Sequence, residues 1–206
     1  MSDFTYEAAI REAIFSMPEG TVFAMGDLQD LTSYDSLRKV LSRFCTAGHI
    51  ERITQGIYRF APKGSEGAQT DAAEIDVANA LARNNCWQIL PGTEAARYFL
   101  GISDTAPNYF LYLSTGPTST YSYGKGKKVR LLHSGGKFMT SMSEKPALVT
   151  SALMDLKYHS VTPHEIAVLS SSLTQEEKDL LMAERMYAPA RLRPVFEIIC
   201  GKYGAK

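Results

Sequence analysis

The hydrophobic pattern of the first 60 residues predicts helices and short strands. An apolar stripe at helical spacing predicts a first helix that Thr5 caps and that Pro18 and Gly20 end. The stripe consists of Tyr6, Ala9, Ile10, Ala13 and Ile14. The β-prone run 21–25 predicts a short strand, and residues 27–31 predict a short second helix.

A more strongly amphipathic helix is predicted to begin at Asp35. Its apolar residues stand at positions i, i+3, i+4 and i+7, so one face of the helix would be buried. They are Leu37, Val40, Leu41 and Phe44. The opposite side is polar and basic, with Arg38, Lys39, Ser42, Arg43 and Thr46. Polar residues 32–34 supply capping groups, and Gly48 is a natural C-terminal stop.

The stretch HIERITQGIYRF, residues 49–60, predicts a β-hairpin that turns at Gln55 and Gly56. The complete order is therefore helix, strand, helix, turn, helix and a two-stranded wing. This is the order of a winged helix-turn-helix, in which the third helix enters the major groove of DNA. We expect this domain to span residues 1–66.

Charge is distributed unevenly, although 22 Lys and Arg balance 22 Asp and Glu in the whole chain. Residues 1–32 carry six acids and one base, whereas residues 33–63 carry six bases and two acids. A local basic surface attracts phosphates even when the net charge is zero. We therefore expect the third helix and the wing to face DNA and the acidic first helix to face away.

The predicted DNA-facing residues lie at the start of the third helix, on its polar side and on the wing. They are Ser33, Tyr34, Ser36, Arg38, Lys39, Arg43, Arg52, Gln55 and Arg59. Lys39 and Arg43 are expected to be the main contacts with phosphates or bases. Tyr34 is equally compatible with a packing role. A solvated basic helix face, or a winged helix that docks a protein, remains an alternative to DNA binding.

A change of composition marks the end of the first domain. Pro62, Gly64, Ser65 and Gly67 predict a flexible linker, so that residues 67–206 form a second domain. Helical segments are predicted at 72–84, 92–100, 144–157, 161–170, 172–187 and 190–202, the last interrupted near Pro194. Strands are predicted around 86–92, 108–114, 118–124 and 128–133. The fold class is therefore α+β, with a small central sheet in the second domain.

One segment of the second domain is basic and contains no acid. Between Asp104 and Glu144 there are five bases and no Asp or Glu. Lys125, Lys127, Lys128 and Arg130 lie close together in this segment, interleaved with tyrosines. The pattern is compatible with a second nucleic-acid surface, with a docking face for an acidic protein, or with a hairpin edge that lysines protect from aggregation.

Composition places the chain among ordinary globular proteins, with 45% hydrophobic and 21% charged residues. The sequence predicts no signal peptide and no membrane-spanning run. Cys45, Cys86 and Cys200 are odd in number and far apart, which favours free thiols in a reducing cytoplasm.

Motifs of catalysis are missing from the sequence. There is no phosphate-binding loop, no dinucleotide fingerprint and no HExxH zinc motif, and the four histidines lack ligand spacing with cysteines. The polar loop after Leu113 either holds a site or forms a β-turn. We expect no enzymatic activity, no cofactor and no metal.

Several segments resemble the AbiEi-type antitoxins and the related DUF6088 proteins of bacteria. They are PEGTVFAMGDLQDLTSYDSLRKVLSRFCTAGHIERITQGIYRF, ALARNNCWQILPGTEAARYFLGIS, YFLYLSTGPTSTYSYGKGKKVRLLH and SEKPALVTSAL, in this order along nearly the whole chain. The runs RKVLSRF with GIY, and YLSTGPTSTY, are the most specific of these matches.

The resemblance implies a type IV antitoxin that is encoded beside a nucleotidyltransferase-like toxin. It implies that the winged helix represses its own operon by binding inverted repeats in double-stranded operator DNA, where two copies can assemble. It also implies that the C-terminal domain counteracts the toxin. The chain lacks the Gly-Ser turn and paired aspartates that the toxin itself would carry. The alternatives are a protein-interaction module of a mobile element, or a nucleic-acid-processing enzyme with a site after Leu113.

Overall fold

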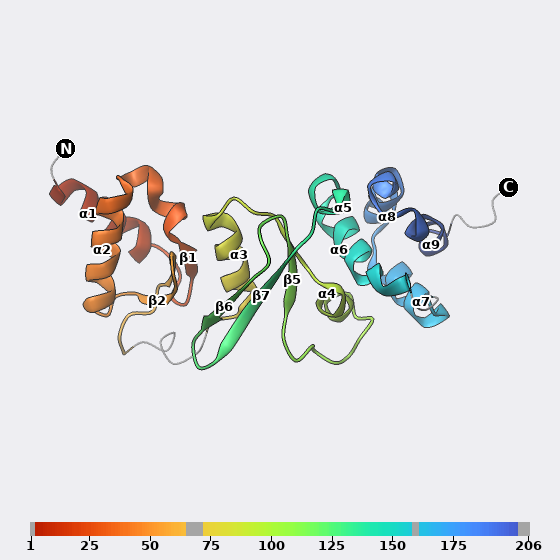
Figure 1. Ribbon diagram of the computed structural model, residues 1–206, viewed down its shortest axis with the longest axis horizontal. Coiled ribbons are helices and arrows are strands. Elements are labelled where there is room, and N and C mark those ends of the chain that lie inside the picture. The colour runs from red at the N-terminus through yellow and green to blue at the C-terminus, as the bar shows by residue number, and fades with distance from the viewer. Residues whose placement is uncertain (1–2, 65–71, 158–160, 202–206) are drawn as a thin grey trace. The chain divides into compact units, whose positions relative to one another are not determined.

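The computed structural model describes residues 3–64, 72–157 and 161–201 (Figure 1). They form a mixed α+β protein with two small sheets. The chain divides into two compact units, Met1–Trp87 with Thr120–Val129, and Gln88–Ser119 with Arg130–Lys206. This division differs from the boundary expected near residue 66, and the linker residues Ser65 and Gly67 lie outside the described residues.

The first unit contains the predicted order of elements. They are α1 (Asp3–Phe15), β1 (Val22–Ala24), the 3-10 helix η1 (Met25–Leu31), α2 (Tyr34–Thr46), β2 (Glu51–Thr54), β3 (Ile57–Arg59) and α3 (Glu74–Asn84). The strands form an antiparallel sheet in the order β1-β3-β2. Two details differ from expectation: the second helix is 3-10, and α1 begins at Asp3, so that Thr5 is inside the helix.

Both ends of α2 follow from local chemistry. At its start, the Ser33 hydroxyl accepts a hydrogen bond from the backbone N–H of Ser36 at 3.4 Å. At its end, Gly48 has a φ of +75°, and its N–H donates to the carbonyl of Cys45 at 3.0 Å. The N–H of His49 then donates to the carbonyl of Phe44 at 2.9 Å, which completes a Schellman motif. The predicted stop at Gly48 is confirmed.

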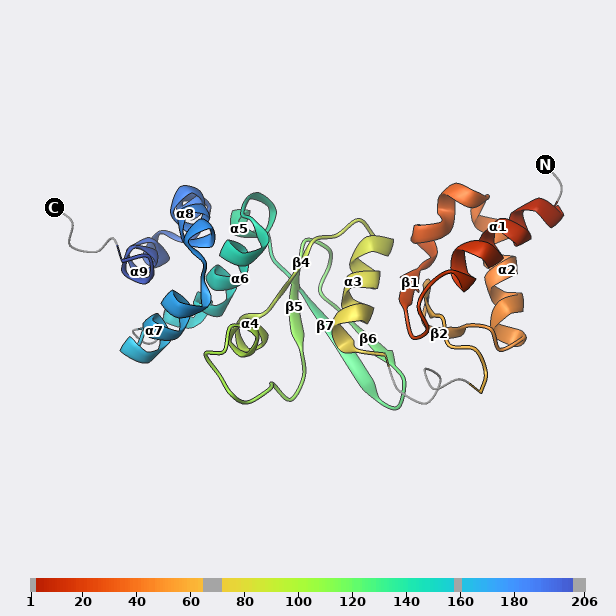
Figure 2. The same cartoon turned by 180° about the vertical axis from the view of Figure 1, so that it is seen from behind.

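The core of the first unit is built around the apolar face of α2. Leu37, Val40, Leu41 and Phe44 are all buried, as the sequence predicted. They belong to one apolar cluster with Ile10 and Ile14 of α1, Phe23 of β1 and Leu28 of η1. Figure 2 shows α1 and α2 from behind, with β1 and β2 beside them. Because one side of α2 is fully used in this cluster, its basic side remains on the surface.

The second unit combines helices with most of a four-stranded sheet in the order β4-β5-β7-β6. The strands are β4 (Ile89–Pro91), β5 (Leu111–Ser114), β6 (Ser119–Tyr123) and β7 (Lys127–His133). The division between the units assigns Thr120–Val129 to the first unit. Strand β5 pairs antiparallel with β4 and parallel with β7.

Most helices of the second unit were predicted. They are α4 (Thr93–Phe99), α5 (Lys137–Ser141), α6 (Glu144–Ala152), η3 (Met154–Lys157), α7 (Pro163–Ser172), α8 (Gln175–Glu184), η4 (Arg185–Tyr187), η5 (Ala190–Leu192) and α9 (Arg193–Ile199). Helix α5 was not expected from the sequence. The interruption predicted near Pro194 is present, because the 3-10 helix η5 ends at Leu192 and Pro194 lies in the first turn of α9, where its missing N–H is harmless.

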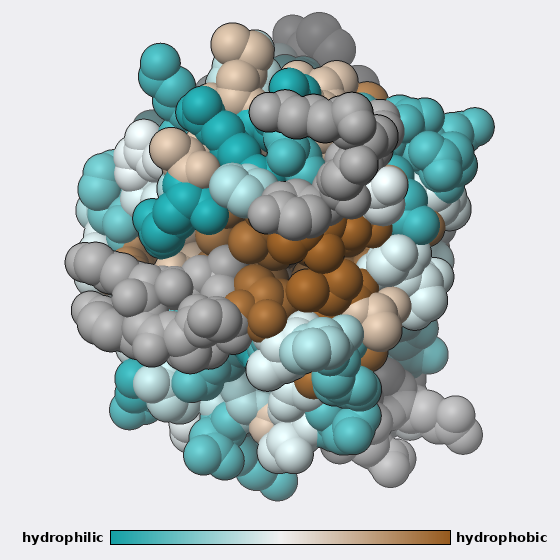
Figure 3. All heavy atoms as spheres, turned by 90° about the vertical axis from the view of Figure 1, so that its right-hand side faces the viewer, coloured by the Kyte–Doolittle hydropathy of each residue, from teal (hydrophilic) through white to brown (hydrophobic). Residues whose placement is uncertain are grey.

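Thr162 and Thr174 cap α7 and α8, and each forms a reciprocal capping box with the glutamate three residues on. Helices α4 and α6–α9 share one apolar cluster that includes Leu153, Leu169 and Phe196. The face of this unit shown in Figure 3 carries an area of apolar side chains. Leu180 and Met186, from α8 and η4, are among the exposed apolar residues of the chain.

Glu165 is a buried carboxylate that ties α7 to α4. It forms an ion pair with Arg97, and it accepts hydrogen bonds from the backbone and hydroxyl of Thr162. Burial by itself raises the pKa of Glu165, but these hydrogen bonds and the Arg97 charge outweigh it and lower the pKa below its usual value. The charged form is therefore favoured in the folded protein.

Leu41→Ala should destabilise the protein by about 2–5 kcal/mol, because Leu41 is completely buried and the smaller side chain leaves a cavity. Lys39→Ala, two residues away on the exposed side of the same helix, is the matched control and should change stability by less than about 0.5 kcal/mol. Urea unfolding followed by circular dichroism measures both. Equal effects of the two substitutions would contradict the burial described here.

The lowered pKa of Glu165 predicts a loss of stability in acid. Because the pKa is lower in the folded state, this stabilisation is present above the unfolded value, about 4.3, and is lost as the pH falls through the folded value. Melting temperatures measured from pH 7 to pH 3 should fall more steeply for the native protein than for Glu165→Gln. Glu176→Gln, in the exposed first turn of α8, is the control and should retain the native slope.

Candidate nucleic-acid interface

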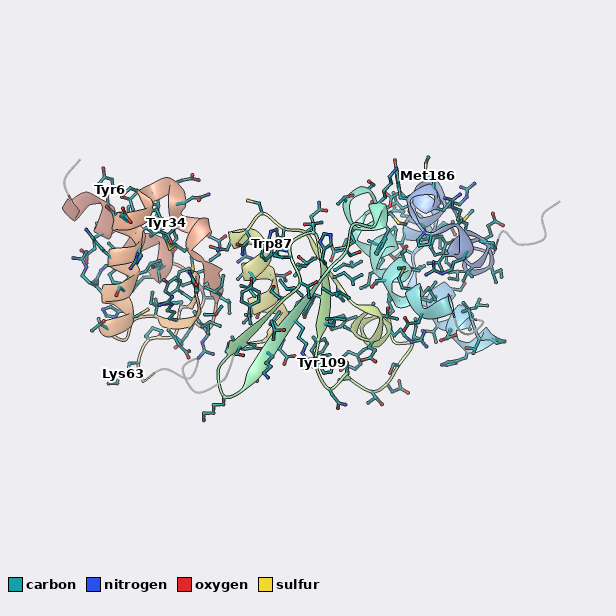
Figure 4. All side chains as sticks on the ribbon, in the orientation of Figure 1. Tyr6, Tyr34, Lys63, Trp87, Tyr109 and Met186 are labelled. Carbon is teal, nitrogen blue, oxygen red and sulfur yellow. The ribbon has the colours of Figure 1, made fainter. Side chains whose placement is uncertain are left out.

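The polar side of α2 forms an exposed ridge. Arg38, Lys39 and Arg43 are exposed, and the Tyr34 side chain is 66% exposed at the start of the helix (Figure 4). Ser33 is exposed and Ser36 is half-buried, and both hydroxyls are used in the helix cap. Tyr34 is therefore a surface residue in the unliganded chain.

A hollow lies on each side of this ridge. We call the larger one the hairpin-side groove; it has a volume of about 1270 Å³ and is lined by residues of η1, α2, the β2–β3 hairpin, the end of α3 and Tyr121. The smaller one, the first-helix hollow, has about 730 Å³ and lies between α1 and α2. Arg38 and Ser42 line both hollows, so the ridge of α2 separates them.

The hairpin-side groove is polar and has no acidic wall. Its charged residues are Arg38 and Arg52, and none of the described residues that line it is Asp or Glu. Its other polar residues include four side-chain amides and three tyrosines. They are Gln29, Gln55, Asn84, Asn85, Tyr34, Tyr58 and Tyr121. A groove with fixed positive charge and many hydrogen-bond donors suits a phosphate-rich ligand.

Two weakly acidic side chains in the groove wall, Cys45 and Tyr58, have raised pKa values. Burial raises the pKa of the Cys45 thiol, and the nearby charge of Arg52 only partly offsets this effect. Burial also raises the pKa of Tyr58, against the opposing charge of Arg52. Neither group becomes an anion at neutral pH, so they do not cancel the arginine charges.

Arg43 is less available than the sequence suggested. Its guanidinium lies 2.7 Å from a carboxylate oxygen of Glu7, although the Arg43 side chain remains 62% exposed. The expectation that the acidic first helix faces away is wrong at this point, because α1 packs beside α2 and brings Glu7 to the edge of the ridge. Among the described residues, no carboxylate forms an ion pair with Arg38, Lys39 or Arg52.

Arg59 is not on the surface, which corrects its assignment as a DNA-facing residue. Only 4% of the residue is exposed, and its guanidinium lies 2.5 Å from a carboxylate oxygen of Glu51. The reason is tertiary: β3 is the central strand of its sheet, and all three of its residues are buried. Arg52 and Gln55, on the other strand and on the turn, are exposed as predicted.

The end of α3 was missed as part of this surface. Arg83 makes a bidentate ion pair with Asp27 of η1, at 3.1–3.3 Å. The Asn84 side-chain oxygen accepts a hydrogen bond from the N–H of Gly26 at 3.2 Å. Gly56, in the hairpin turn, lies against the Asn84 side chain, where an added Cβ would be only 3.2 Å from the amide nitrogen. No local pattern in the sequence indicates these contacts.

The second basic segment does not form one surface. Lys125 and Lys128 are exposed, but Arg130 lies over the ring of Tyr109, 4.2 Å from its centroid, in a cation–π contact. Side chains alternate along β7, so Lys127 lies on the opposite face from Lys128 and Arg130. These four residues therefore do not all lie on one face of the strand.

The loop after Leu113 is held by its own hydroxyl groups. Thr115 accepts a hydrogen bond from the N–H of Gln88, and Thr118 accepts one from the N–H of His133, both at 3.0 Å. The His133 ring nitrogen Nδ1 also lies 2.9 Å from the Gly116 carbonyl. These bonds give both threonines a role in fastening the loop to neighbouring strands.

The described residues contain neither a cluster of metal-ligating side chains nor a membrane-spanning helix. No three or more His, Cys, Asp or Glu side chains among them lie close enough together to hold a metal ion. His159, one of the four histidines, is outside the described residues. In the described ranges there is also no helix with both the length and the apolar character needed to cross a membrane.

Comparison with known proteins identifies the family. The model of DUF6088, described as a family of unknown function, matches residues 9–181. The chain belongs to the DUF6088 family. Among solved structures, it is similar to the RV2827C protein from Mycobacterium tuberculosis, with a TM-score of 0.44 and 12% identity, over 97% of this chain and 78% of that one. No curated protein matches the chain. Membership in DUF6088 confirms that part of the resemblance seen in the sequence.

Arg59→Met should reduce the stability of the folded protein, because Arg59 is buried and paired with Glu51. We expect a loss of about 1–3 kcal/mol, because the substitution removes the ion pair with Glu51 from a buried strand. Arg52→Met, at the exposed neighbouring strand, should change stability by less than about 0.5 kcal/mol. Thermal and urea unfolding measure the difference, and a fully stable Arg59→Met protein would contradict a structural role for Arg59.

Proposed function

We propose that the first unit is a winged helix-turn-helix that binds double-stranded DNA, with α2 as its recognition helix and the β2–β3 hairpin as its wing. The observation that carries the proposal is the exposed basic ridge of α2 beside a groove without acidic residues. A basic helix face that is only solvated has no need of a neighbouring groove, so the hairpin-side groove favours a bound ligand over simple solvation.

The shape of the ridge supports insertion into the major groove. A helix with its side chains is about 10–12 Å across, and the major groove of B-DNA is about 12 Å wide. The hairpin-side groove leaves space for one of the two strands that border a major groove. In this arrangement Arg38, Lys39 and Ser42 point toward base edges, while Arg52 and Gln55 of the wing reach the phosphate backbone.

The biological role that we propose is that of a type IV antitoxin and transcriptional autorepressor in the bacterial cytoplasm. It would bind inverted repeats in its own operator and counteract a nucleotidyltransferase-like toxin, without enzymatic activity or a cofactor. Support comes from the resemblance of the segments quoted above to AbiEi-type antitoxins, together with membership in DUF6088. Two alternatives to this proposal are a protein-docking module and a nucleic-acid-processing enzyme. DNA-binding measurements distinguish the docking module from the proposed repressor.

Binding to a duplex that contains the chain's own upstream region should be strongly salt-dependent. Each phosphate contact contributes about −0.9 to the slope of log affinity against log salt. Arg38→Ala and Lys39→Ala should each weaken binding, about 5- to 100-fold for a lost base contact and less for a lost phosphate contact. Fluorescence anisotropy at several salt concentrations measures affinity and slope together.

Lys137→Ala serves as the control, because Lys137 is an exposed base in α5 of the second unit. It should bind DNA like the native chain. Native protein that shows no DNA affinity at moderate salt would contradict the proposal and favour a docking module. Co-expression with the product of the adjacent reading frame tests the antitoxin role separately: the chain should restore growth that a nucleotidyltransferase-like toxin stops.

A further inference from the structure

The hairpin-side groove is lined partly by residues that lie outside the predicted winged helix. Asn84 and Asn85 come from the end of α3, and Tyr121 comes from β6. All three belong to the same compact unit as α2 and the hairpin, although they follow the linker in sequence. The groove is therefore completed by a part of the chain that a DNA-binding domain ending at residue 66 would not include.

Side-chain contacts of Arg83 and Asn84 hold the end of α3 against η1 and the hairpin turn. The Arg83 pair with Asp27 and the Asn84 bond to Gly26 attach it to η1, and Asn84 also fills the space beside Gly56 in the hairpin turn. Asp27 in turn accepts a hydrogen bond from the N–H of Ala24, at the end of β1. Asn85 follows directly after these anchors, so its position in the groove is set by the same contacts.

The groove is suited to a polymer strand more than to a small molecule. Its volume of about 1270 Å³ exceeds the 300–1,000 Å³ of typical small-ligand pockets. Its arginines and amides can contact successive phosphates, and the described lining contains no carboxylate that would repel them.

We propose that the hairpin-side groove takes the phosphodiester backbone of one strand of the bound duplex, and that Asn85 and Tyr121 contact this strand together with Arg38 and Arg52. The inference rests on the proposed DNA binding and extends it beyond residue 66. The Asn85 amide nitrogen donates one N–H to the Leu81 carbonyl at 2.8 Å. An amide NH2 group has a second N–H, which can donate to a phosphate oxygen. The Tyr121 hydroxyl is a donor of the same kind.

Asn85→Lys in the full chain gives a test that misfolding cannot imitate, because the expected result is tighter binding. A cation at this position should raise the affinity for the duplex on the order of 3- to 10-fold and steepen the log–log salt slope by about 0.9. The matched control is Asn79→Lys. Asn79 is an exposed residue of α3 that lines a different hollow, together with Thr21 and Asp76. It adds the same charge and should leave both quantities nearly unchanged.

Tyr121→Phe supplies an independent second measurement. Removing the hydroxyl should weaken duplex binding on the order of 3-fold or more with an unchanged salt slope, while Tyr98→Phe on α4 has no effect. If Arg38→Ala weakens binding but Asn85→Lys behaves like Asn79→Lys and Tyr121→Phe like the native chain, the inference fails and the proposed DNA binding stands. If native protein does not bind duplex DNA at all, both fail.

Discussion

The burial of one face of α2 is the constraint on which the rest of the first unit depends. Leu37, Val40, Leu41 and Phe44 pack into a single apolar cluster with α1, β1 and η1. Since removing these side chains from water is the main source of stability here, the helix cannot rotate about its axis without exposing them. The basic residues on its other side are consequently held at the surface. The same packing brings α1 beside α2, which places Glu7 next to Arg43. Arg38 and Lys39 remain as the cations of α2 that form no ion pair with another described residue.

The end of α3 adds a second constraint, and it is polar. Arg83 and Asn84 fasten this helix to η1 and to the hairpin turn, so elements on both sides of the linker form one compact unit. The Asn84 bond to Gly26 is partly buried and favours one arrangement because an unpaired buried polar group is costly, whereas the Arg83–Asp27 pair is exposed. Gly56 is required beside Asn84 both for its φ of +76° and for the close approach of the amide. The surface that we propose for DNA thus depends on the geometry of α3 as well as on α2 and the hairpin.

Periodicity predicted most elements, and what it left open has an identifiable cause. Helix α2 was predicted with its buried and exposed sides because its apolar residues repeat at helical spacing and its caps are strong. The break near Pro194 was also predicted, because a proline disrupts a helix interior but is accepted in a first turn, and α9 begins beside it. For the basic segment at Lys125–Arg130 the sequence left several alternatives open, because charge along a sequence does not show that a strand turns alternate side chains to opposite faces.

The sequence by itself determined which segments are helices or strands in the first unit and which side of α2 is apolar, because these properties depend on neighbours a few residues away. It also carried the resemblance by which membership in DUF6088 was expected. Only the tertiary structure decided that Arg59 is buried in a central strand, that Glu7 reaches Arg43, and that Asn84, Asn85 and Tyr121 line the groove beside α2. Each of these depends on contacts between residues distant along the chain, and no local pattern of polarity records which distant side chain will be the neighbour.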